Sequence, residues 1–314
     1  MKNYLNNSDR IHYYCGDSLT RPVCYNKNFV EDTSFLFLNA FKNDNNNSYE
    51  KDLIHFIKKN KLEVKFTDGV LKYCPRDRVE LFTKIPTLVK SRVISEDDHC
   101  SILVKMNTTR HFQNLKTLLK KDVPFHEKKN ALVWRGATTG YGFGNHIPKR
   151  SVSRETLVKK YCNEASFKKG MNVGLSKIIQ EAKKKEKEYQ KFLRPTMTLD
   201  ELVQYKYILS VEGNDVATNT KWIMCSNSVL FMPKPQIESW FLESKLVPFV
   251  HYIPVNDDFS NLEGQIKWCN ENPKKCKEII KNAKDYVKIF LDEKNENKIM
   301  KSVLELYLKN VQFV

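Results

Sequence analysis

The sequence predicts an α/β fold in which helices alternate with the strands of a parallel sheet. Residues 207–211 (YILSV) form a short apolar run that is bounded as a buried strand is. A polar loop follows. Residues 218–228 then predict a helix, because they start with Thr218 or Asn219, two residue types that cap helices. A second apolar run, 229–232 (VLFM), ends at a pair of nearby prolines. Strand, loop, helix and strand in this order make a βαβ unit, which predicts a parallel sheet.

The residues before this unit supply further elements. Residues 52–60 have helical spacing, and 62–69 alternate as a strand does before they end in Asp-Gly, a turn dipeptide. The runs 85–92 and 101–106 predict two more strands.

The middle of the chain repeats the pattern. Residues 131–136 predict a strand, 136–145 a glycine-rich loop, and 153–162 a helix with Ser153 as its cap. Residues 181–192 predict a highly charged helix, whose face is either solvated or a binding surface; a solvated face is the commoner case.

The last third of the chain predicts mainly helices. Residues 238–246 have a helical pattern, 251–255 predict a strand, and 260–272 a helix opened by a capping box of Ser260 and Glu263. Two amphipathic helices are expected after that. The segment 276–291 would place these residues on one face: Ile279, Ile280, Ala283, Tyr286, Val287 and Phe290.

Length and composition restrict the class of protein. The chain has 314 residues, room for two domains, and its 18 Phe, 14 Tyr and 4 Trp can fill packed cores. It has no apolar run of the roughly 18 to 20 residues that span a membrane, and its first residues have no apolar signal core. Its 8 cysteines are scattered without a CxxC pair, which indicates reduced thiols, and its histidines are too dispersed for a zinc pattern. We therefore expect a cytoplasmic protein.

A net charge of +16 favours partners that carry phosphate. Nucleic acid, an anionic membrane surface and phosphorylated glycans all fit this charge. Because the lysines are spread over many helices and no nucleic-acid-binding motif is present, we expect no nucleic-acid partner. Peripheral contact with an anionic membrane surface stays open.

The loop EGNDVATN follows the first strand of the βαβ unit. Open α/β sheets bind ligands at the carboxyl ends of their strands, and the free N–H groups of a helix N-terminus suit an anion. The residues expected to hold that ligand are Asn214, Asp215, Val216, Ala217, Thr218 and Asn219.

Four blocks of sequence resemble glycosyltransferase family 90, most closely its bacterial lipopolysaccharide branch. They are FTDG before IPTLVKSR (66–92), WRGATTG (134–140) with Arg154 downstream, the βαβ unit (205–234), and the segment 240–269. The resemblance covers about residues 62–290, and the first 60 residues carry none of it. Protein O-glucosyltransferases and fungal capsule-associated xylosyltransferases belong to the same family.

The resemblance implies a GT-B fold, two Rossmann-like domains with a cleft between them. Residues 1–125 would form the acceptor-side domain, 126–290 the nucleotide-sugar-binding domain, and 291–314 a C-terminal helix that packs back on the first domain. The implied activity is inverting transfer of glucose, xylose or galactose from a uridine diphosphate (UDP) sugar to a hydroxyl of a glycan such as lipopolysaccharide, including a lipid-linked one. The UDP-sugar is a co-substrate, and neither a metal nor another cofactor is expected.

The resemblance assigns Asp68 as the general base. Inversion is an in-line displacement, in which a base takes the proton of the acceptor hydroxyl while the diphosphate leaves from the opposite face. Asp68 ends a predicted strand and matches the family's catalytic Asp; its alternative role is to begin an Asp-Gly turn. Asp215 is a weaker rival because it would face the diphosphate, and Asp97 and Asp98 fall in a predicted surface turn.

Diphosphate binding without a metal requires basic side chains. Arg154 matches the family's diphosphate-binding Arg and starts a predicted helix. Arg135 is the next candidate, with a structural ion pair as its alternative role. Lys221 is either a further charge at the site or a surface lysine.

Asn219 departs from the family pattern, because eukaryotic members have an Arg at its position. Arg154 would then supply more of the positive charge that binds the diphosphate, and Lys90 and Arg92 are additional candidates for this role. The departure also keeps a second function open, that of a catalytically inactive member that binds a sugar nucleotide or a glycan. Ala137 likewise replaces a serine that contacts the donor in some members.

Overall fold

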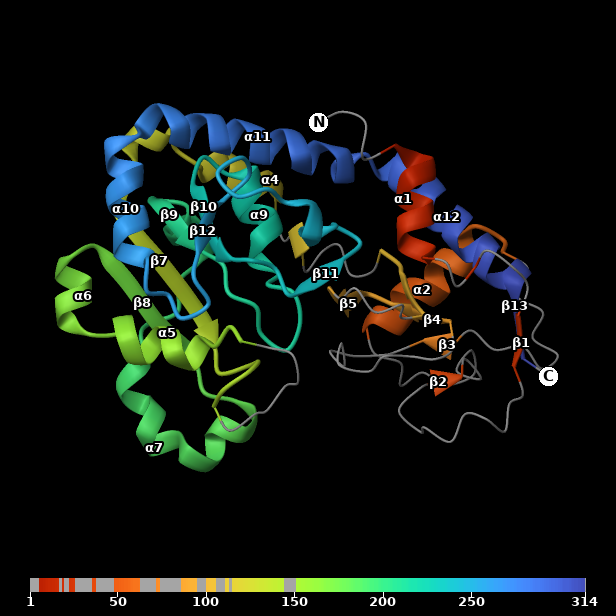
Figure 1. Ribbon diagram of the computed structural model, residues 1–314, viewed down its shortest axis with the longest axis horizontal. Helices are drawn as coiled ribbons and strands as arrows, with labels where there is room; N and C mark the ends of the chain where they lie inside the picture. Colours follow the sequence, from red (N-terminus) through yellow and green to blue (C-terminus); the bar gives the residue numbers. More distant parts are fainter. Residues whose placement is uncertain are drawn as a thin grey trace. The chain divides into compact units, whose positions relative to one another are not determined.

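The structure is a computed structural model (Figure 1). It describes residues 6–16, 19, 23–25, 36–37, 48–62, 72–73, 86–94, 100–105, 111–112, 115–143 and 151–313. By packing, the chain divides into two compact units. Unit 1 comprises residues 1–108, 237–242 and 290–314, and unit 2 comprises 109–236 and 243–289. The GT-B arrangement and the expected domain limits at 125 and 290 stay predictions.

Unit 2 is built on a sheet of five parallel strands, which confirms the predicted α/β class. The strands are β7 (Lys129–Ala137), β8 (Met171–Lys177), β9 (Tyr205–Leu209), β10 (Val229–Pro233) and β12 (Ile253–Val255). Their order across the sheet is β12-β10-β9-β7-β8. Strand β8 therefore lies on one side of β7, and β9, β10 and β12 follow in order on the other side. Such a reversal in strand order is a topological switch point, where doubly wound sheets bind ligands.

The strands of unit 2 form where apolar residues are consecutive, because both faces of the sheet are covered. Leu132, Val133 and Trp134 of β7 are buried, and β10 is buried along its whole length. The helices that pack beside these strands are α5 (Arg154–Tyr161) and α6 (Glu164–Lys168) at β8, α9 (Asn219–Cys225) at β10 and α10 (Leu262–Glu271) at β12 (Figure 1). Unit 2 also contains the short helices α4 (Leu115–Lys121) and α8 (Leu199–Leu202) and a 3-10 turn (Phe125–Glu127).

The two amphipathic helices expected near the C-terminus are α11 (Pro273–Leu291) and α12 (Glu293–Asn310). The predicted face of α11 is confirmed, since all six of its apolar residues are buried: Ile279, Ile280, Ala283, Tyr286, Val287 and Phe290. Among the described residues, no helix is long and apolar enough to cross a membrane.

Unit 1 contains α1 (Asn7–Cys15), α2 (Ser48–Lys59) and α12, with α1 packed on α12. Its strands are short. Strands β2 (Leu36–Phe37), β3 (Lys72–Tyr73), β4 (Thr87–Val89) and β6 (Ser101–Leu103) form one sheet, β1 (Val23–Tyr25) pairs with β13 (Val311–Phe313), and β5 (Ser91–Val93) pairs with β11 (Ile237–Ser239). The predicted strand 62–69 lies mostly outside the described residues.

Three predicted elements differ from the structure. The helix expected at 238–246 is wrong: this segment contains β11, antiparallel to β5, and then a 3-10 turn (Glu243–Lys245). Its residues 237–243 are all buried, including the polar Glu238, Ser239 and Glu243, so polar residues in this segment do not mark an exposed helix face. The charged helix expected at 181–192 is instead two 3-10 turns (Gln180–Lys185, Gln190–Phe192) around one turn of helix, α7 (Glu186–Tyr189).

The third difference is the start of α10. Asn261, not Ser260, occupies its cap position, and among the described residues its side chain makes no capping hydrogen bond. The expected capping box of Ser260 and Glu263 is therefore wrong. Ser260 lies one residue before the cap and follows a turn in which the N–H of Phe259 donates to the carbonyl of Asn256 (2.8 Å).

Candidate functional site

Two loops meet at the switch point of unit 2, one after β7 and one after β9. The N–H of Gly140 donates to Oδ1 of Asn214 (2.8 Å), which joins the glycine-rich loop directly to the predicted ligand loop. A Cβ on Gly140 would lie 2.7 Å from the backbone of Gly213, and Gly140 has φ +93°. Both the backbone conformation and the close approach therefore require glycine at 140.

Arg154 joins the same two loops. Its Nη1 donates to the carbonyl of Ala137 (3.1 Å) and to Oγ1 of Thr139 (2.8 Å) in the first loop. Its Nη2 donates to the carbonyl of Val211 (2.7 Å), and its Nε to that of Glu212 (3.0 Å), in the second loop. These four oxygens hold the guanidinium at the switch point.

The loop after β9 is held by its own polar side chains. Asp215 is buried, its carboxylate accepts from the N–H of Val216 (2.7 Å), and its carbonyl accepts from Gly213 (3.1 Å). Oδ1 of Asn219 accepts from the hydroxyl of Ser210 (2.8 Å). Asn219 thus fixes the start of α9 to the end of β9.

The helix after this loop is shorter than predicted. It was expected over 218–228 and is α9, Asn219–Cys225. Ser226 has extended backbone and ends it. Thr218 occupies the cap position, as expected, although among the described residues its side chain makes no capping hydrogen bond. With only two turns in the helix, backbone N–H groups of the loop matter more for an anion than the helix dipole.

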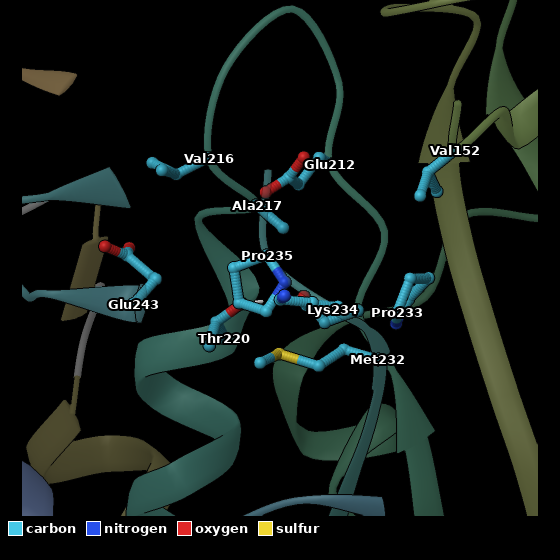
Figure 2. A pocket seen from close by; sticks show the side chains of 11 residues that line it. Val152, Glu212, Val216, Ala217, Thr220, Met232, Pro233, Lys234, Pro235 and Glu243 are labelled. Atoms are coloured by element: carbon cyan, nitrogen blue, oxygen red, sulfur yellow. Dashed lines mark hydrogen bonds between the residues drawn. The ribbon is translucent and has the colours of Figure 1, made fainter. Parts of the chain in front are cut away.

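A pocket adjoins this loop at the carboxyl ends of β9 and β10, with an empty volume of about 330 Å³ that includes space open to solvent. Figure 2 shows that its walls come from the β9–α9 loop, the first turn of α9 and the end of β10. The lining residues are Val152, Ser210, Glu212, Val216, Ala217, Thr220, Met232, Pro233, Lys234, Pro235 and Glu243.

Lys221 is not the surface lysine that the sequence left open. It is fully buried, and its Nζ lies 2.7 Å from Oε1 of Glu243, whose side chain is also buried. Glu243 lines the pocket, so this ion pair places a fixed carboxylate at the pocket wall.

Arg135 is directed toward β8. Its guanidinium donates to the carbonyls of Asn172 (2.9 Å) and Pro195 (3.0 Å) and to Oδ1 of Asn172 (2.8 Å). The structure thus joins Arg154 to the ligand loop and places Arg135 in contacts with a neighbouring strand. The role of Arg135 in donor binding stays a prediction.

Lys90 and Arg92 both lie in unit 1 and are buried. Nε of Arg92 lies 2.8 Å from Oε1 of Glu238, and its other nitrogens donate to the carbonyls of Ser101 and Tyr13 (both 3.0 Å). Arg92 therefore cross-links β5, β6, β11 and α1 within this unit. A contact of either residue with the donor stays a prediction.

The predicted base, Asp68, lies outside the described residues, as do Asp97 and Asp98. Within the described residues, no three His, Cys, Asp or Glu side chains gather in a way that could hold a metal ion. This finding leaves the question of metal dependence open.

Sequence reasoning missed three carboxylates at this end of unit 2: Glu212, Glu243 and Glu155. Glu155 accepts from the N–H of Phe143 in the glycine-rich loop (2.6 Å). A glutamate in the first turn of a helix is commonplace, so no local pattern distinguishes it. Glu243 lay in a segment predicted as helix, and its pairing with Lys221 depends on the tertiary fold.

Together, the parallel sheet and the loops joined at its switch point define an α/β protein with a candidate ligand site on unit 2. The model of Glycosyl transferase family 90 matches residues 104–314, about two thirds of the chain. The chain belongs to glycosyltransferase family 90, and it is a glycosyltransferase. Its activity therefore requires a sugar donor and a glycan acceptor.

Two relatives show how far the similarity extends. The chain is 33% identical to the O-glucosyltransferase LpsA of Dichelobacter nodosus over 92% of this chain and 78% of the relative. It is 33% identical to the protein O-glucosyltransferase 3 of Rattus norvegicus over 32% of this chain and 19% of that relative.

The bacterial match corrects one expectation. Because it covers 92% of the chain, it extends into the first 60 residues, which had been placed outside the resemblance. Asp68, Lys90 and Arg92 all precede residue 104, where the family model begins to match.

Proposed function

We propose that this protein is an inverting, metal-independent glycosyltransferase of GT-B architecture. It transfers a sugar from a UDP-sugar to a hydroxyl of a glycan such as lipopolysaccharide. The observation that carries the proposal is Arg154, whose guanidinium joins the loops after β7 and β9 at the switch point of a parallel sheet. Ligands bind at this position in doubly wound sheets, and an arginine fork matches phosphate oxygens.

The transfer chemistry gives Arg154 and the backbone N–H groups of the ligand loop different roles. Negative charge accumulates on the diphosphate as it leaves, so cationic and N–H donors that are already in place lower the barrier. Arg154 supplies the cation, and the backbone N–H groups of 214–219 supply neutral donors.

Glucose is the first donor sugar to test, because both relatives described above are named O-glucosyltransferases. Xylose and galactose are the alternatives that the family resemblance leaves open. A hydrolysis screen with UDP-glucose, UDP-xylose and UDP-galactose ranks them. Release of UDP from none of them would contradict the proposed activity.

Calorimetry with UDP in the presence of a chelator tests the metal-independent site. We expect the same affinity with chelator and with added manganese, because Arg154 and the loop N–H groups provide the positive potential themselves. Binding that disappears with chelator and returns with manganese would overturn the metal-independent part of the proposal.

Asp68 is proposed as the general base. A positioned base contributes about 10²- to 10⁴-fold, so we expect Asp68→Asn to lower turnover by roughly that factor. UDP affinity should stay near the wild-type value, because the base faces the acceptor. Near-normal turnover of the variant on the true acceptor would show that the base is another residue, and loss of UDP binding would place Asp68 in the donor site.

Asn219 is the observation that favours a second candidate, an inactive member of the family that binds a sugar nucleotide or a glycan. Its side chain is bonded to Ser210 and supplies no charge. Product formation separates the two candidates, since both would bind UDP and only the first would transfer the sugar.

A further inference from the structure

The glycine-rich loop after β7 has an unusual backbone conformation. Gly140, Gly142 and Phe143 have φ of +93°, +90° and +54°. Left-handed backbone is rare and unfavourable for a bulky residue, so the surrounding structure must hold Phe143 in place.

A carboxylate and a tyrosine hold it. Oε2 of Glu155 accepts from the N–H of Phe143 (2.6 Å), and Oε1 of Glu155 accepts from the hydroxyl of Tyr189 (2.9 Å). The rings of Phe143 and Tyr189 pack edge to face with their centroids 5.1 Å apart, and both residues are buried. Tyr189 therefore supports Phe143 twice, once through the ring and once through Glu155.

Glu155 is itself fixed in position. It lies in the first turn of α5, where Oγ of Ser153 accepts from its N–H (3.1 Å), and Nζ of Lys159 lies 2.7 Å from Oε1. A Cβ on Gly142 would lie 2.4 Å from Oγ of Ser153 and 3.0 Å from Oε2 of Glu155. The loop and the start of α5 thus pack with no space for a side chain between them.

This loop carries two of the contacts that build the switch point. Thr139 accepts from Arg154, and Gly140 donates to Asn214. Both residues lie within four positions of Phe143. Fixing Phe143 therefore fixes the position of Thr139 and Gly140 relative to the ligand loop.

We propose that Glu155 and Tyr189 are positioning residues that preorganise the glycine-rich loop for the sugar-nucleotide donor. The inference rests on the proposed function, and it assigns no contact with the donor to either residue. A loop that is ordered before binding loses less conformational entropy when the donor binds, so the donor affinity is higher.

The test uses Tyr189→Phe, which keeps the ring against Phe143 and removes only the hydroxyl. We expect the dissociation constant for UDP to rise roughly three- to tenfold, the size expected for one lost hydrogen bond. The donor KM should rise by a similar factor while kcat stays within about twofold, because preorganisation acts on donor binding. Glu155→Gln is the second variant, with an expected change of the same direction and at least the same size.

Tyr161→Phe is the matched control. Tyr161 is a buried tyrosine of α5 whose hydroxyl donates to the carbonyl of Phe259 (2.7 Å), away from the loop. It should lose thermal stability comparable to Tyr189→Phe with no change in UDP affinity.

Folded Tyr189→Phe and Glu155→Gln proteins that bind UDP as tightly as the wild type would overturn the positioning role alone. Equal loss of affinity in the Tyr161→Phe control would also overturn it, because the effect would then be one of general stability. A wild-type protein that binds no UDP would overturn the proposed function together with this inference.

Discussion

Two arginines that the sequence analysis proposed for diphosphate binding lie in different surroundings. Arg154, at the switch point of unit 2, donates to three backbone carbonyls and a threonine hydroxyl. Arg92, in unit 1, is buried against the carboxylate of Glu238 and donates to two carbonyls. Arg154 is thus bonded to the two loops of the candidate site, and Arg92 to a buried carboxylate of unit 1.

The difference determines what each arginine contributes. The hydrogen bonds of Arg154 to both loops orient its guanidinium at the switch point, as a preorganised site requires. A buried carboxylate offsets the charge, and the pair then mainly links the elements around it. This comparison favours Arg154 as the residue that meets the diphosphate and Arg92 as a residue that holds unit 1 together.

The largest effect is expected from Arg92→Ala. Removing one partner of a buried ion pair costs about 3 to 5 kcal/mol of folding free energy. Urea denaturation should show this loss in the transition that unfolds unit 1. UDP affinity of the folded variant should remain near that of the wild type.

The double variant Arg92→Leu, Glu238→Leu is the control, because it removes both charges. It should be more stable than Arg92→Ala if the buried charge of Glu238 causes the loss. A folded Arg92→Ala protein with greatly weakened UDP binding would break the comparison and return Arg92 to the donor site.

The next effect is expected from Arg154→Ala. Loss of a hydrogen-bonded charge should weaken UDP binding by roughly 1.5 to 3 kcal/mol in calorimetry. Arg154→Lys should recover part of this, since lysine restores the charge without the planar fork. Unchanged UDP affinity in Arg154→Ala would show that the guanidinium only joins the two loops.

Most of the sheet of unit 2 could be predicted from local sequence. The strands at 131–136, 207–211 and 229–232 were expected because consecutive apolar residues between turn residues indicate a strand covered on both faces. Strand β11 was not predicted, because its polar residues Glu238 and Ser239 are buried and therefore mark no exposed face. Strand β11 pairs with β5. Because Arg92 of β5 and Glu238 of β11 are 146 residues apart in the chain, this pairing depends on tertiary structure.

The candidate site was predictable only in part. The ligand loop and Arg154 followed from a strand–loop–helix pattern and a family resemblance. The environments of Arg92 and Lys221 could not be predicted, because Glu238 and Glu243 lie in a segment whose fold was predicted incorrectly. Glu155 and Tyr189 are 34 residues apart and meet only when α7 packs against α5.

The smallest effect concerns a carboxylate beside Arg154. Burial alone would raise the pKa of Glu155, but hydrogen bonds from Lys159, the N–H of Phe143 and Tyr189 together hold its pKa below the ordinary value of 4.5. A carboxylate whose pKa is lowered by folding stabilises the protein above its unfolded-state pKa, and this contribution is lost as the pH falls through the folded-state pKa.

We therefore compare the melting temperatures of the wild type and Glu155→Gln at two pH values. At pH 7 the wild type should be more stable by less than about 1 kcal/mol, as for partly exposed ion pairs. The difference should shrink as the pH falls through the folded-state pKa and vanish once Glu155 is protonated in both the folded and the unfolded state. Glu164→Gln, which alters an exposed carboxylate paired with Lys168, should match the wild type at both pH values. A constant difference between wild type and Glu155→Gln across this range would mean that the charge of Glu155 does not hold the loop, since the loss would then come from packing alone.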